Sequence, residues 1–408
     1  MKRVKKRQQL SGSRSVNGSG SGAKREEHVS WKKQKLVDIH QALNSDPVDI
    51  ETLRRAAVSE GGLLTDDVRR KVWPKLLSVN VFELPAKPGK NVRENHKDYN
   101  QVLLDVRRSM RRFPRGMRVG EREVLQEQLI DIILDVLRRN PQLHYYQGYH
   151  DIVVTFLLVV GERMAIAMVE TLSNHHLRDF MDPTMDSTKH ILNYLMPILE
   201  QVDPELHGFM LRAEVGTIFA LSWLITWYGH VLSEFRHILR LYDFFLASHP
   251  LMAIYFAAVI VLHREREVKS SDCDMASVHH LLSQIPQNLP YEQLITQAQR
   301  LFDSYPPTLL ASCAALQSRK SVCVCETRAT DWTAGRKTRR EQREERVYVT
   351  QDAALQKGGD RKRRNEAKEG ERERRRESER RRERERAMKV IKVSITYGTM
   401  IGGEIKAF

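Results

Sequence analysis

Amphipathic segments with the period of an α-helix follow one another along most of the chain. From Glu26 to about Ala315, apolar residues recur at helical spacing, whereas the alternating pattern typical of strands is scarce. Proline or a glycine pair stands at each break between segments, where helices end or begin. The breaks are Asp46-Pro47, Gly61-Gly62, Pro114, Asn140-Pro141, Asp182-Pro183, Asp203-Pro204, His249-Pro250 and Pro306-Pro307. The pattern predicts an all-α fold, with a single multi-helix domain over residues 26–316.

The segments on either side of this region lack helical periodicity. Residues 1–25 are basic and rich in Gly and Ser, and they contain no apolar stretch of the kind that a signal peptide requires. Residues 317–408 include an Arg/Glu tract of low complexity at 361–386. We therefore predict a disordered basic N-terminal arm over 1–25 and a low-complexity, disordered tail over 317–408.

Most of the positive charge lies outside the predicted domain. The formal net charge is +15, yet residues 1–33 carry ten Lys or Arg against two Glu, and residues 361–386 carry fourteen against eight. The central body is therefore close to neutral. Basic tails can bind phosphate polymers, but no reading motif accompanies the Arg/Glu tract. A binder of nucleic acid or anionic membrane is the less favoured alternative, and we expect no specific nucleic-acid binding.

The cysteines indicate neither a disulfide framework nor a metal site. Cys273, Cys313, Cys323 and Cys325 are few and clustered, which is typical of a reduced, intracellular protein. Cys323 and Cys325 have no second Cys or His pair at zinc-finger spacing. The sequence therefore predicts no bound metal.

The most apolar run extends from Pro250 to Leu262. Its thirteen residues fall short of the roughly twenty that are needed to cross a bilayer. We predict that this run forms a buried core helix rather than a membrane span.

A helical segment around Arg108 separates an apolar face from a charged one. With about 100° per residue, the residues of the apolar face fall within one third of the helical wheel. They are Val102, Leu103, Val106, Met110 and Phe113. Arg108 projects from the opposite face, with Asp105 three residues before it and Arg112 four residues after it. Asp105 could orient the guanidinium for a partner, although a solvated basic face with a weak ion pair would explain the same pattern.

Gln147 stands in the turn HYYQGYHD, between a helix that ends at Asn140-Pro141 and the apolar run that follows Asp151. Residues in such turns are exposed yet held by the elements on either side. Tyr145 and Tyr146 can bury their rings and leave the Gln147 carboxamide pointing outward, with a donor and an acceptor end. A glutamine that only caps its own turn is the alternative.

Taken together, the two segments resemble the paired signatures of TBC domains, the Rab GTPase-activating fold. The sequence V-x-x-D-x-x-R at 102–108 resembles the IxxDxxR signature, and Y-x-Q-G at 145–148 resembles YxQ. Val102 in place of isoleucine preserves the shape of the side chain. The resemblance extends over about residues 50–310 and implies an all-helical domain that acts on a GTPase.

Two further motifs support the resemblance. The run R-R-x-x-W-x-x-L-L at 69–77 is similar to the opening motif of the domain, and R-L-Y-D at 240–243 is similar to its R-x-W-D motif. Tyr242 stands in place of tryptophan, which we expect to loosen core packing without affecting the signatures. The structural residues that this resemblance implies are Arg70, Trp73, Arg240 and Asp243.

The resemblance implies a mechanism with two fingers. Arg108 would be an arginine finger oriented by Asp105, and Gln147 a glutamine finger that positions the attacking water, with Tyr145 and Gly148 in support. Arginine suits this role because its planar, permanently charged group matches phosphate oxygens. The chain would then be an activator rather than an enzyme with substrate chemistry of its own. It would need no cofactor, because GTP and Mg²⁺ belong to the Rab partner.

The chain looks most like members of the family that associate with the endoplasmic reticulum. This likeness implies a GTP-bound Rab protein as partner, a role in ER-to-Golgi membrane traffic, and a cytoplasmic location at the cytosolic face of ER or ER-Golgi membranes. The Arg/Glu tract stands where such members carry an apolar anchor, so peripheral and anchored membrane association both stay open. A catalytically silent TBC scaffold is the second hypothesis, and the presence of both Arg108 and Gln147 argues against it.

Overall fold

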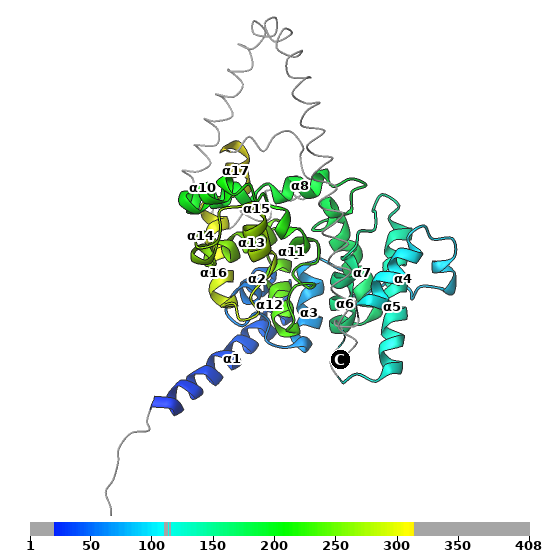
Figure 1. The fold of residues 1–408 in the computed structure, drawn as a ribbon. Helices are drawn as coiled ribbons and strands as arrows, with labels where there is room; N and C mark the ends of the chain where they lie inside the picture. Colours follow the sequence, from blue (N-terminus) through cyan, green and yellow to red (C-terminus); the bar gives the residue numbers. More distant parts are fainter. Residues whose placement is uncertain (1–19, 110–112, 114–115, 314–408) are drawn as a thin grey trace, which may run out of the picture. The chain divides into compact units, whose positions relative to one another are not determined.

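The computed structural model describes residues 20–109, 113 and 116–313, which form helices joined by turns and loops (Figure 1). No strand occurs in these ranges, so the predicted all-α class is confirmed. The first helix begins at Gly20, so it includes the last six residues of the predicted arm over 1–25. The rest of the predicted arm, and the predicted tail over 317–408, lie outside the described residues.

The first part of the fold contains the helices α1 (Gly20–Asn44), α2 (Ile50–Val58), α3 (Asp66–Leu76), η1 (Lys90–Arg93, a 3₁₀ helix), α4 (Tyr99–Arg108), α5 (Val119–Arg139), α6 (Tyr149–Val160) and α7 (Glu162–Asn174). Side-chain caps fix two of the helix starts, because Asp49 accepts a hydrogen bond from Thr52 N and Thr65 accepts one from Val68 N. Helices α4 to α7 form one packed group (Figure 1), in which α5 contacts the other three.

The second part contains η3 (Arg178–Met181), α8 (Asp186–Leu192), α9 (Leu195–Val202), α10 (Pro204–Arg212), η4 (Ile218–Ala220), α11 (Leu221–Ile225), α12 (Phe235–Leu246), α13 (Met252–His263), α14 (Glu265–Lys269), α15 (Met275–Ser283), α16 (Tyr291–Ser304) and α17 (Pro307–Cys313). The predicted break at 203–204 is a helix start, where Asp203 caps α10 and Pro204 takes its first position. The predicted breaks that fall on described residues thus mark real helix boundaries, and Pro114 lies outside the described residues.

Helix α13 is the apolar run that the sequence assigned to the core. Residues 252–261 are all buried, and the helix packs against α9, α11 and α16. A helix that is apolar on every face needs neighbours on every side, which the surrounding helices provide. Among the described residues, no helix combines the length and the apolar character that crossing a membrane requires.

A buried carboxylate joins α12 to α3. Asp243 is fully buried and accepts hydrogen bonds from Arg69 (Nη2 to Oδ2, 2.9 Å), Trp73 (Nε1 to Oδ1, 2.8 Å) and Leu63 (N to Oδ2, 3.0 Å). Gly62 has a φ of +55°, and a Cβ on it would lie 2.5 Å from Asp243 Oδ2. Only glycine leaves room for the carboxylate at this turn.

Arg69, rather than Arg70, holds the buried position of the opening motif. Arg70 instead donates to the Val159 carbonyl oxygen at 2.7 Å and pairs with Asp67 near the surface. Arg70, which the resemblance implies as a structural residue, thus bonds to the end of α6, while Arg69 makes the buried contact with Asp243.

Arg240 and Tyr242 also occupy the core side of α12. Arg240 pairs with Glu292 (Nε to Oε1, 2.8 Å) and donates to carbonyl oxygens at the end of α2, including Ala57 O at 3.0 Å. The Tyr242 ring lies 5.6 Å from that of Phe156 and is fully buried. Both residues therefore serve the architecture of the domain.

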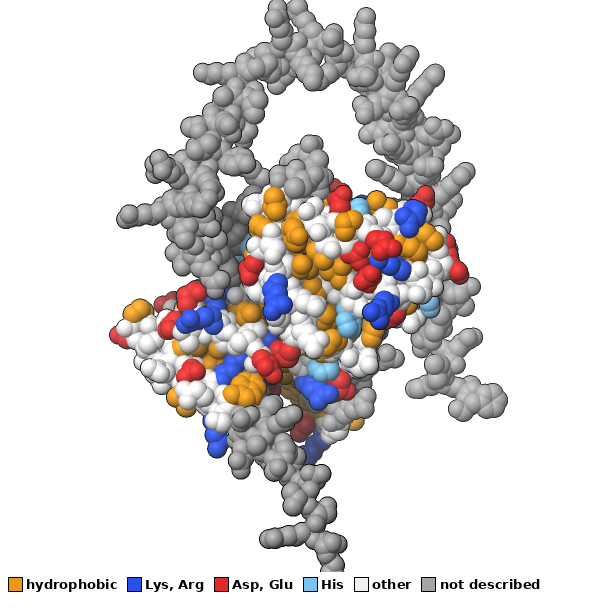
Figure 2. Space-filling view, turned by 90° about the vertical axis from the view of Figure 1, so that its left-hand side faces the viewer, with side chains coloured by type: hydrophobic (Ala, Val, Ile, Leu, Met, Phe, Trp, Pro, Cys, Tyr) orange, Lys and Arg blue, Asp and Glu red, His pale blue; other side chains and the backbone are white. Residues whose placement is uncertain are grey.

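The surface of the described region carries charges of both signs. On the face drawn in Figure 2, Lys and Arg side chains are interspersed with Asp and Glu side chains and do not gather into one basic patch. This distribution fits a near-neutral body whose excess charge lies in the terminal segments.

Candidate functional site

Arg108 is the last residue of α4, and its side chain is exposed. The helix ends directly after it, where the Ser109 hydroxyl donates to the Val106 carbonyl oxygen at 2.8 Å. Arg108 therefore extends from the end of a helix. Most of the predicted apolar face is confirmed, with Val102, Val106 and Phe113 buried, Leu103 half-buried, and Met110, like Arg112, outside the described residues.

Asp105 is turned into the protein. Its side chain is only 2% exposed, and it accepts hydrogen bonds from Gln101 Nε2 at 3.0 Å and from the Tyr145 hydroxyl at 2.9 Å. Within the described residues it makes no ion pair with Arg108. The structure therefore connects Asp105 to the turn of Gln147, forty residues further along the chain, while direct orientation of the guanidinium stays a prediction.

Tyr145 is the residue that joins the two predicted segments. Burial, together with the neighbouring Asp105 carboxylate, raises the pKa of the Tyr145 hydroxyl well above its usual range. The hydroxyl consequently stays protonated and donates to Asp105 at neutral pH. The hydroxyl also lies 3.4 Å from His150 Nδ1. Tyr145, predicted as a supporting residue, thus fixes the turn against α4.

We expect Tyr145→Phe to lower the free energy of unfolding by about 1–3 kcal/mol, because it removes a donor from a buried carboxylate while leaving the ring in place. Urea denaturation of the full chain, followed by circular dichroism, measures this change. Tyr99→Phe is the matched control on α4, since Tyr99 is half-buried and its hydroxyl has no hydrogen-bond partner among the described residues. Equal stability of wild type and Tyr145→Phe would contradict the assignment.

Gln147 is exposed in the turn before α6 and forms no hydrogen bond with another described residue. The interpretation as an internal cap therefore has no support in this region. Gly148 follows in the left-handed conformation, with φ +111°, and a Cβ on it would lie 2.8 Å from the Thr226 methyl group. Glycine at 148 allows the chain to turn sharply while it packs against Thr226.

Aromatic packing holds this turn from behind. The Tyr146 ring lies 6.3 Å from that of Phe180, and the Tyr149 hydroxyl lies 2.6 Å from Ser173 Oγ. These contacts attach the turn to η3 and α7. The backbone that presents Gln147 is therefore fixed although its side chain is exposed.

The geometry suits action on another molecule. Arg108 offers a permanent cation and Gln147 an uncharged amide, and the Asp105–Tyr145 hydrogen bond joins the elements that present them. A hollow of about 610 Å³ between α1 and α2 and another of about 510 Å³ beside Arg236 and Tyr291 contain neither residue. The two side chains thus extend from the surface instead of lining either hollow.

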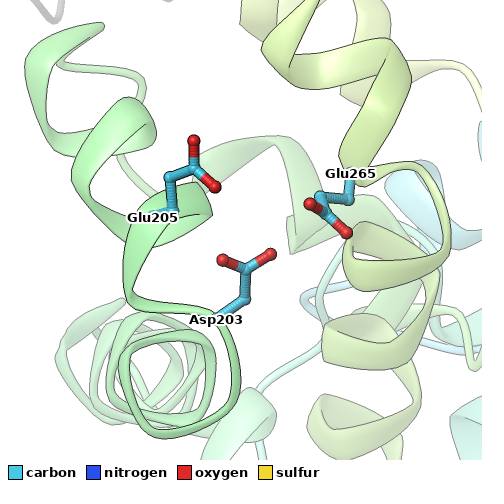
Figure 3. Close-up of side chains that lie close together, drawn as sticks. All are labelled: Asp203, Glu205 and Glu265. Carbon is cyan, nitrogen blue, oxygen red and sulfur yellow. The ribbon is translucent and has the colours of Figure 1, made fainter.

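One cluster of carboxylates has the composition of a metal site. Asp203, Glu205 and Glu265 point toward one another, with oxygens within 4.8 Å (Figure 3). However, the Lys269 ammonium lies 2.7 Å from both Glu205 Oε2 and Glu265 Oε1, and these hydrogen bonds raise the pKa of Lys269 above its usual value. The positive charge of Lys269 offsets the repulsion between the carboxylates. The cluster is therefore an ion-pair network between α10 and α14.

Two long-range pairs, one in the core and one beside the Gln147 turn, were missed in the sequence. Glu292 pairs with Arg240 across 52 positions, and Asp151 lies near His230 across 79 positions. Neither pair has a local spacing that sequence reasoning could detect. For the Asp151–His230 pair, the sequence offers only one histidine in each of the runs G-Y-H-D (148–151) and Y-G-H (228–230).

The chain belongs to the Rab-GTPase-TBC domain family, whose pattern matches residues 66–269. It is 69% identical to human TBC1 domain family member 20 over 313 residues, which cover 75% of this chain and 78% of that protein. It is also 32% identical to the GTPase-activating protein gyp10 of Schizosaccharomyces pombe over 270 residues, covering 65% of this chain and 70% of that protein. The solved Ypt/Rab-GAP domain of Gyp1p has the same fold, with a TM-score of 0.53 and 15% identity over 67% of this chain and 98% of that one.

Proposed function

We propose that this chain accelerates GTP hydrolysis by GTP-bound Rab proteins, with Arg108 as arginine finger and Gln147 as glutamine finger. The observation that carries the proposal is the hydrogen bond between Asp105 and Tyr145, which couples the end of α4 to the turn before α6. Family membership supports a Rab protein as the partner. Both fingers are exposed, as action on a separate protein requires.

The proposed mechanism divides the work between the two side chains. GTP hydrolysis is slow when charge that develops on the transferred phosphoryl group is not neutralised and the attacking water is poorly held. The Arg108 guanidinium would donate to phosphate oxygens and offset this charge. The Gln147 carboxamide would accept a hydrogen bond from the water through its oxygen and donate through its nitrogen, without changing charge. The Rab protein would supply GTP and Mg²⁺.

The cellular setting forms part of the same proposal. We place the activity in ER-to-Golgi membrane traffic, at the cytosolic face of the ER or of ER-Golgi membranes, because of the resemblance to ER-associated TBC proteins. Membrane association could be peripheral or anchored. Imaging of the tagged full chain beside ER and Golgi markers tests the location, and a uniform cytoplasmic or nuclear signal would contradict it.

We expect Gln147→Ala to reduce the stimulation of Rab GTP hydrolysis by about 10²–10³-fold, which is typical for loss of one positioned transition-state hydrogen-bonding group. The measurement is single-turnover hydrolysis by a panel of GTP-loaded Rab proteins with the full chain. Stability should change little, because the side chain is exposed and makes no internal hydrogen bond with the described residues.

Gln142→Ala is the matched control for this experiment. It removes the same side chain five residues earlier, where Gln142 bonds to Asn174 on the surface, and stimulation should stay within about twofold of wild type. If wild type binds Rab proteins but stimulates none of them, the chain is a silent scaffold. If Gln147→Ala keeps full stimulation, the assignment of Gln147 as a glutamine finger is wrong.

A further inference from the structure

A loop from a distant part of the chain packs directly behind the Gln147 turn. It follows α11 and comprises residues 226–230, and the Thr226 methyl group occupies the space beside Gly148 that a Cβ would need. The loop packs equally tightly on itself, because a Cβ on Gly229 would lie 2.9 Å from the Thr226 carbonyl oxygen. The loop and the turn are therefore packed directly against each other, and within the loop only His230 is exposed.

The backbone of this loop adopts an unusual conformation. Trp227 and Tyr228 are consecutive non-glycine residues with φ of +44° and +62°. Both side chains are buried in the core, where the Trp227 ring lies 5.3 Å from that of Tyr242 and the Tyr228 hydroxyl donates to Ala253 O at 2.9 Å. Left-handed backbone at bulky residues persists only where the surrounding structure enforces it, and it is concentrated at functional sites.

The loop ends by presenting His230 beside the turn. Its backbone N–H donates to Thr226 Oγ1 at 3.2 Å, and its Nδ1 lies 3.3 Å from Asp151 Oδ2. Asp151 is only 2% exposed and stands four residues after Gln147, in the first turn of α6, whereas the His230 side chain is 67% exposed. In the tautomer that donates its Nδ1–H to the carboxylate, Nε2 is the ring nitrogen that can accept a hydrogen bond from another molecule.

We propose that His230 is a third side chain that contacts the Rab protein, with Asp151 as its positioning residue. This inference rests on the proposed function, since it places the GTPase over the Gln147 turn. An ordinary surface histidine needs neither a buried carboxylate nor a left-handed loop. Burying the Asp151 carboxylate and holding the loop backbone in this conformation both cost free energy, and a role in binding would explain that cost. The imidazole would accept a hydrogen bond from a donor group of the GTPase, close to the point where Gln147 would enter the active site of the GTPase.

The test compares His230→Ala with wild type on the Rab protein that the full wild-type chain stimulates most. Loss of this hydrogen bond and its packing should weaken binding of that Rab protein, loaded with a non-hydrolysable GTP analogue, by about tenfold. KM in the hydrolysis assay should rise by a similar factor while kcat changes less than about threefold. His230→Gln, which keeps an acceptor, should recover part of the affinity. His263→Ala, at an exposed histidine at the end of α13, is the control.

The pair is tested by a double-mutant cycle with Asp151→Asn. If Asp151 acts through His230, the combined variant should bind hardly more weakly than His230→Ala alone. Additive losses would remove the positioning role of Asp151. If His230→Ala binds and activates like wild type while Arg108→Ala is inactive, the inference on His230 is overturned and the proposed function stands. If the wild type binds no Rab protein in the panel, both are overturned.

Discussion

Arg108→Ala is expected to abolish nearly all stimulation of Rab GTP hydrolysis, a loss of about 10³–10⁵-fold in kcat. The reason is that an arginine supplied in trans neutralises charge that the GTPase leaves unbalanced in the transition state. Arg108→Lys should restore little, because an ammonium group lacks the planar fork that bonds two phosphate oxygens at once. Single-turnover hydrolysis by GTP-loaded Rab proteins at saturating concentrations of the full chain measures the effect.

Arg107→Ala is the control for this prediction. It lies next to Arg108 on α4, is also exposed, and removes the same charge, so general electrostatic attraction falls equally in both variants. We expect it to cost less than about tenfold, mainly in KM. Circular dichroism should show intact helices for both variants. An Arg108→Ala protein that keeps a tenth of the stimulation, or an Arg107→Ala protein that loses as much, would contradict the arginine-finger assignment.

The helical fold could be predicted from sequence because its signals are local. A helix shows its period within two turns, and proline or an aspartate cap marks its ends, as at Asp203 and Pro204 before α10. The burial of α13 could also be predicted locally, because an apolar run of thirteen residues suits a core helix better than a membrane span. Features that depend on one residue and its near neighbours could therefore be predicted from the sequence.

The site could be predicted only in part, because its connections are not local. Spacing placed Asp105 within reach of Arg108, but the carboxylate turns inward to Tyr145, which lies forty positions away. A helical wheel cannot detect a buried donor on another element, and a buried carboxylate binds where donors are available. The same limitation hid the pairing of Asp151 with His230. Long-range hydrogen bonds thus decide how the elements that present Arg108 and Gln147 are supported.

The largest expected effect on stability concerns the carboxylate that joins α12 to α3. Asp243→Ala should lower the free energy of unfolding by about 3–5 kcal/mol, because it leaves the buried Arg69 guanidinium without its main counter-charge. Trp73 Nε1 and Leu63 N lose their acceptor in the same substitution. Urea denaturation of the full chain, followed by tryptophan fluorescence, measures the change.

Asp66→Ala separates burial from charge in this experiment. Asp66 also pairs with Arg69, at 2.8 Å, but its side chain is 45% exposed, so its loss should cost at most about 1 kcal/mol. The two variants remove carboxylates from the same arginine, one in the core and one at the surface. A similar cost for both would mean that Asp243 is not the central link between α3 and α12. A large difference would show that the motif residues support the fold on which Arg108 and Gln147 depend.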